Sequence, residues 1–80
     1  MKRLSWVVIQ EGGSSTEFYA HGFNTIRQAQ AYRRVASRAS YRTSPPIDVR
    51  GFEIYPKQEP EFLEVMANVA KSTTEFEYIT

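Results

Sequence analysis

The chain has 80 residues, of which 41% are hydrophobic and 24% are charged, with a formal net charge of +1 and no cysteine. This length and composition predict one globular domain over residues 1–80 and argue against a disordered chain. The lack of cysteine excludes disulfides, zinc–thiolate sites and a thiol nucleophile.

The first two predicted elements are strands that form a hairpin. Leu4–Gln10 (LSWVVIQ) is rich in β-branched and aromatic residues and is apolar on both faces, which is typical of a central strand. Glu11–Ser15 contains two glycines and reads as a turn. Thr16–Phe23 (TEFYAHGF) is then the second strand.

The next predicted element is a helix with a marked start. Thr25–Gln28 (TIRQ) fits a capping box, and Asn24 is an alternative cap. The helix is expected to end near Ser40, because 44–46 (Ser-Pro-Pro) cannot continue it. At 100° per residue, the side predicted to be buried holds Ala29, Tyr32, Val35, Ala36 and Ala39. The opposite side holds Arg27, Arg34 and Arg38.

A third strand is predicted over Ile47–Tyr55 (IDVRGFEIY). Its apolar residues change phase at Gly51, where a β-bulge would restore the inward face. Because a domain this small buries only about 60% of its unfolded surface, aromatic side chains are expected to supply much of the core. They are Trp6, Phe18, Tyr19, Phe23, Tyr32, Phe52, Tyr55, Phe62, Phe76 and Tyr78.

A second helix is predicted after Pro56–Gln58, with Pro60 at its first position and Lys71 in its last turn. Glutamates that favour the positive end of this helix are Glu59, Glu61 and Glu64. Its predicted apolar stripe is Phe62, Val65, Met66 and Val69. Glu75–Ile79 alternates and predicts a short edge strand.

These elements predict an α+β fold in the order β-β-α-β-α-β. We expect two layers, a mainly antiparallel sheet with both helices on one face.

Charge is unevenly distributed along the chain. Residues 1–50 carry eight basic and three acidic side chains, a net of +5, whereas residues 51–80 carry two basic and six acidic side chains, a net of −4. Arginine offers a planar, forked donor that suits carboxylates and phosphates. The candidate partner-binding residues are therefore Arg27, Arg33, Arg34, Arg38, Tyr41 and Arg42.

This cluster has more than one interpretation. It could be a solvated helix face, with some arginines paired to acids of the second helix. It could equally be a contact surface for an acidic protein, since interfaces favour arginine and tyrosine. A nucleic-acid partner is a further alternative, although the domain is barely basic and lacks a helix-turn-helix, KH or RRM signature.

Catalytic, metal and cofactor sites are not predicted. His21 is the single histidine and could act as a general base, but a nucleophile or orienting carboxylate is not evident at a motif spacing. One histidine without cysteine is a poor metal-ligand set. The missing catalytic set predicts a non-enzymatic protein. Apolar runs fall short of the roughly 18 residues that span a bilayer, so we expect a cytoplasmic protein without a membrane partner.

The segments FNTIRQAQAYRR (23–34) and SYRTSPP (40–46), in a small cysteine-free αβ chain, resemble small proteins encoded by bacteriophages and mobile elements. Anti-CRISPR inhibitors belong to this kind of protein. The resemblance is one of type and carries over no functional residue. It implies stoichiometric binding to a host defence protein or ribonucleoprotein complex, such as a CRISPR effector, in the host cytoplasm.

Two other roles remain open from the sequence. One is a nucleic-acid-binding regulator that uses the basic helix face on phosphates. The other is a structural or oligomerising phage component, including a homodimer formed through an exposed strand.

Overall fold

The central strand of the molecule is β1 (Trp6–Glu11), which lies between β2 (Phe18–Phe23) and β3 (Ile47–Asp48) in an antiparallel sheet. The computed structural model describes residues 3–13 and 17–79, without the side chains of 71–73. The helices are α1 (Ile26–Arg38) and α2 (Glu59–Thr73), and two 3-10 turns, η1 (Arg50–Phe52) and η2 (Pro56–Gln58), precede α2. The predicted α+β class is confirmed.

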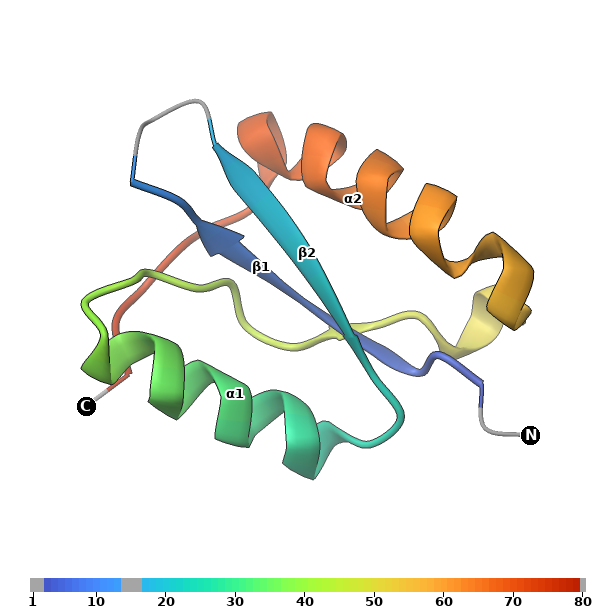
Figure 1. Cartoon of the computed structure of the whole chain (residues 1–80), viewed down its shortest axis with the longest axis horizontal. Helices are drawn as coiled ribbons and strands as arrows, with labels where there is room; N and C mark the ends of the chain where they lie inside the picture. The colour runs from blue at the N-terminus through green and yellow to red at the C-terminus, as the bar shows by residue number, and fades with distance from the viewer. Residues whose placement is uncertain (1–2, 14–16, 80) are drawn as a thin grey trace.

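The predicted hairpin is also confirmed, with Trp6 opposite Phe23 and Glu11 opposite Phe18. The predicted start of the second strand at Thr16, and part of the turn before it, lie outside the described residues. Since β2 and β3 are both antiparallel to β1, they run in the same direction. The chain therefore crosses over β1 by way of α1 (Figure 1).

The two helices lie on opposite faces of the sheet, so the expectation of both helices on one face is wrong. His21 is paired with Val8 and contacts Tyr32 of α1, at 4.6 Å between ring centroids. Ile9 points to the other face and belongs to the cluster that packs against Met66 of α2. In Figure 1 the strands run between the two helices. The physical reason is that β1 is apolar on both faces, so each face needs its own cover.

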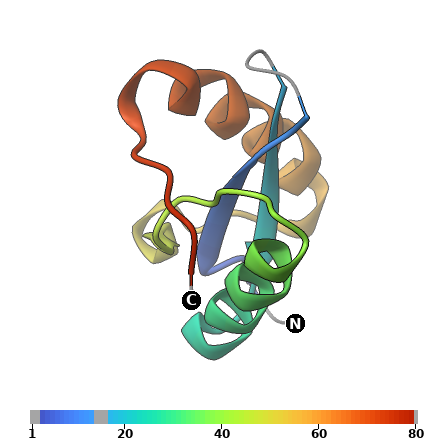
Figure 2. The ribbon, with the colours of Figure 1, turned by 90° about the vertical axis from the view of Figure 1, so that its left-hand side faces the viewer.

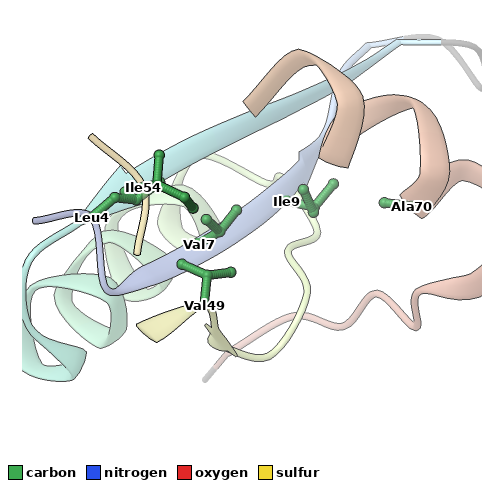
Figure 3. Close-up of a cluster of buried hydrophobic side chains, with 6 residues drawn as sticks. All are labelled: Leu4, Val7, Ile9, Val49, Ile54 and Ala70. Carbon is green, nitrogen blue, oxygen red and sulfur yellow. The ribbon is translucent and has the colours of Figure 1, made fainter. Parts of the chain in front are cut away.

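The fully buried core is aliphatic rather than aromatic, contrary to expectation. Figure 3 shows the cluster on the α2 side of the sheet, which consists of Leu4, Val7, Ile9, Val49, Ile54 and Ala70. Phe18, Phe62 and Phe76 are only partly buried around this cluster. Phe52, Tyr19, Tyr55 and Tyr78 are exposed. Aromatic rings thus cover the edge of the core instead of filling it.

The buried stripe of each helix is rotated from the predicted one. In α1, Ala29 and Ala36 are buried as expected, but Val35 is 60% exposed and Arg33 is buried. In α2, Phe62 and Met66 pack on the core with Leu63 and Ala70, while Val65 and Val69 are exposed. Sequence periodicity therefore identified the helices but misplaced part of their buried faces.

The predicted third strand is reduced to Ile47–Asp48, and Gly51 lies in η1 rather than in a bulge. The carboxylate of Asp48 accepts hydrogen bonds from the backbone N–H and the guanidinium of Arg50, at 3.0 Å and 2.8–3.0 Å. These bonds hold the pKa of Asp48 at about 2. A local Asp turn therefore competes with strand pairing and ends β3.

The predicted last strand is present only as one bridge. Thr43 and Glu77 exchange two backbone hydrogen bonds, of 3.0 and 2.9 Å, and Thr43 also bridges to Gln10 of β1. Figure 2 shows the end of the chain descending beside the loop that follows α1. The loop thus connects the sheet to the C-terminal segment, 74–79.

Candidate binding surface

The start of α1 is set by local hydrogen bonds. The Thr25 hydroxyl accepts from the backbone N–H of Gln28 at 3.2 Å, and the Gln28 side chain accepts from the N–H of Thr25 at 3.3 Å. The predicted capping box is confirmed. The helix then lies with Ala29 and Ala36 toward the sheet, so residues on its far side face water.

Arg33 does not belong to the exposed cluster, although it was a candidate binding residue. It is 8% exposed, and its Nε donates to the Thr43 hydroxyl at 3.2 Å. Its Nη2 lies 2.7 Å from the carboxylate of Glu77. Burial of a guanidinium is tolerated only where such partners satisfy it. Arg33 therefore holds the C-terminal segment against α1 and is not available to a partner.

Arg42 has a similar internal role. Its Nη2 donates to the backbone carbonyl of Phe76 at 2.6 Å, and its Nη1 lies 3.6 Å from the carboxylate of Glu11. Tyr41, the other loop candidate, is exposed, and its backbone N–H caps α1 through the carbonyl of Ala36. Arg42 thus joins β1 to the C-terminal segment, and Tyr41 is left at the surface.

The remaining candidates form what we call the arginine surface: Arg27, Arg34 and Arg38. All three are exposed, as predicted from the helical period. Within residues 3–13 and 17–79, these guanidinium groups take part in none of the ion pairs or side-chain hydrogen bonds. The acids that pair with the arginine cluster are Glu11 and Glu77, not those of α2. The arginine surface is therefore cationic and unneutralised by the described residues.

A hollow of about 440 Å³ lies within this surface and was not anticipated from the sequence. It is lined by Arg34, Arg38, Ser37 and Ile79. The Ser37 hydroxyl donates to the carbonyl of Ile79, which holds the C-terminal segment there. Since Ile79 lies 41 or more residues from the arginines along the chain, local patterns could not reveal it.

His21 is part of a polar cluster between β1, β2 and α1. Its Nε2 lies 3.0 Å from Gln10 Oε1 and 2.9 Å from the Tyr32 hydroxyl, which also donates to Gln10. Burial lowers the pKa of His21 and raises the pKa of Tyr32, the latter with a smaller contribution from Tyr41. The cluster satisfies polar groups at a helix–sheet contact.

The residues that the structure describes contain no group of three or more histidine, aspartate or glutamate side chains placed to hold a metal ion. In the same residues, neither helix is long and apolar enough to cross a bilayer.

Comparisons with known proteins give no match: no protein-family model, no curated protein and no solved structure is similar to this chain.

Proposed function

We propose that this chain is a non-enzymatic binding protein whose arginine surface docks on an acidic patch of a protein partner. The observation that supports this most directly is that Arg27, Arg34 and Arg38 point outward without an ion pair among the described residues. Arginines are enriched where proteins meet, because their planar donors bind carboxylates in pairs.

The nature of the partner follows from the resemblance to small phage proteins of the anti-CRISPR kind. A stoichiometric inhibitor needs a docking surface and no catalytic residues. The partner in this proposal is a host defence protein or complex, and binding blocks its working surface. The basic surface suits an acidic patch on that partner rather than mimicry of DNA, for which an acidic surface would be needed.

A protein partner is favoured over a nucleic acid by the number of free charges. Arg33 and Arg42 are engaged internally, which leaves three arginines for phosphates on this face. The rest of the chain brings the net charge down to +1. Neutralising three phosphates predicts a slope of about −2.7 when the logarithm of the binding constant is plotted against the logarithm of the salt concentration. This slope is much shallower than that of dedicated DNA-binding proteins.

The test is a capture experiment on bacterial lysate with and without nuclease, using three charge-matched single variants. Arg34→Glu and Arg38→Glu reverse charges of the arginine surface, and Lys57→Glu reverses an exposed cation in η2. We expect one defined protein complex that survives nuclease, is lost with Arg34→Glu or Arg38→Glu, and persists with Lys57→Glu. The inhibitor role is then measured as phage plating on bacteria with active CRISPR immunity, with and without the expressed chain.

Two outcomes would overturn the proposal. Recovery of nucleic acid alone, removed by nuclease, would support a regulator that binds phosphates. Equal capture by wild type and by the Arg34 and Arg38 variants would show that the arginine surface is a solvated helix face and not a binding site.

A further inference from the structure

A second surface, on the opposite side of the sheet, is apolar. Two adjoining hollows of about 340 and 360 Å³ lie between α2 and the segment 47–54. Both hollows are lined by Phe52, Phe62 and Val65. Met66 and Val69 also line the hollow of about 340 Å³. We call this surface the α2 groove.

Three apolar side chains of the α2 groove are more than half exposed. Phe52 is 69% exposed, Val65 is 53% exposed and Val69 is 57% exposed. Val65 and Val69 lie one helical turn apart and therefore form a continuous ridge. Contiguous apolar surface of this kind marks binding sites more often than single exposed residues do.

The backbone next to Phe52 has an uncommon conformation. Glu53, the residue after Phe52, has φ 49°, a left-handed conformation that costs a non-glycine residue about 1 kcal/mol. The Phe52 ring packs at a tilt of 51° against Phe62 of α2, with centroids 5.8 Å apart. The groove is therefore built from two elements that contact one another directly.

Charge around the groove decides what can fill it. Glu61 lines it. Within residues 3–13 and 17–79 the Glu61 carboxylate forms no ion pair. Two copies of this chain that met groove to groove would place their Glu61 carboxylates in the same contact, which disfavours a symmetric homodimer through this surface.

We propose that the α2 groove binds an amphipathic helical segment of a partner protein, with apolar side chains on one face and lysine or arginine beside them. The apolar face would cover Phe52, Val65 and Val69, and a basic residue beside it would pair with Glu61. This contact is separate from the arginine surface, because α1 and α2 lie on opposite faces of the sheet. A chain with both surfaces could hold one partner at two places or join two partners.

The test uses a synthetic helical peptide of leucine and lysine in heptad order as the probe, with a scrambled peptide of the same composition. Binding is followed by the amide NMR shifts of the labelled 80-residue chain. We expect the helical peptide to shift residues of α2 and of 49–54, and Val65→Asp to weaken its binding by about tenfold or more, since a carboxylate would then face apolar side chains. Glu61→Gln should weaken binding by about two- to threefold at low salt.

Val35→Asp is the matched control. Val35 is a valine of similar exposure on α1, across the sheet, so its replacement should leave peptide binding unchanged. Equal binding of the scrambled peptide, or equal effects of Val65→Asp and Val35→Asp, would overturn the proposal. So would a wild-type dimer in light scattering that Val65→Asp dissolves, because a second copy would then cover the groove. None of these outcomes depends on the arginine surface.

Discussion

The two sides of the sheet are closed in different ways. On the α1 side, polar contacts join elements beside the buried Val8, Ala29 and Ala36: Arg33 binds Thr43 and Glu77, and Tyr32 binds Gln10 and His21. On the α2 side, the contacts are made by aliphatic and phenyl groups, and part of the helix stays exposed. Directional bonds fix which segments meet, whereas apolar packing supplies stability without requiring that every apolar residue be covered.

The largest effect is expected from the aliphatic core. Ile9→Ala should lower the free energy of unfolding by about 3 kcal/mol, because it leaves a cavity at a fully buried position of β1. Val65→Ala, in the exposed groove of the same side, should change it by less than about 0.5 kcal/mol. Urea unfolding measures both. Similar losses for the two variants would show that the α2 groove is part of the core after all.

The next effect tests whether the polar closure of the α1 side contributes to stability. Arg33→Met keeps the apolar stem and removes the bonds to Thr43 and Glu77, and should cost about 1–2 kcal/mol. The value is modest because the Glu77 side chain is itself more than half exposed. Arg34→Met, one residue further on the exposed side, should be neutral in chemical unfolding. A neutral Arg33→Met would remove the distinction between the buried and the exposed arginine.

A smaller gain is expected at the end of α1. Ser40 has φ 68°, and its N–H and that of Tyr41 bond the carbonyls of Ser37 and Ala36, the pattern of a Schellman cap. Ser40→Gly should raise the free energy of unfolding by about 1 kcal/mol, because glycine adopts this conformation without steric cost. Ser40→Ala is the control and should bring no gain. Thermal unfolding would distinguish them.

The smallest effect concerns pH. The pKa of His21 is lowered by burial, so the unfolded chain binds more protons than the folded one as the pH falls below the ordinary value of 6.5. Stability should therefore be highest above pH 6.5 and decline as the pH falls through the lowered pKa. Unfolding at pH 7.5 and 5.5 measures this decline, and His21→Asn should reduce it. An unchanged decline in His21→Asn would assign it to other groups.

Several features of this protein could be predicted from the sequence because they depend on neighbouring residues. The capping box of Thr25 and Gln28 uses hydrogen bonds across three residues, and the hairpin joins adjacent strands. The exposure of Arg27, Arg34 and Arg38 follows from the helical period alone. The same period predicted an α-helix after Pro56–Gln58, and α2 lies there.

Other features were decided by contacts between distant residues. Arginine is usually exposed, yet Arg33 is buried because it hydrogen-bonds to Thr43 and Glu77, which lie 10 and 44 residues away along the chain. Val65 and Val69 resemble core residues, but the sheet is too narrow to cover every apolar position of α2. The sequence alone thus determined the hairpin, the presence of both helices and the capped start of α1 with its basic face. Only the tertiary structure decided which arginines are free and which apolar residues remain exposed, because burial depends on what the rest of the chain brings alongside.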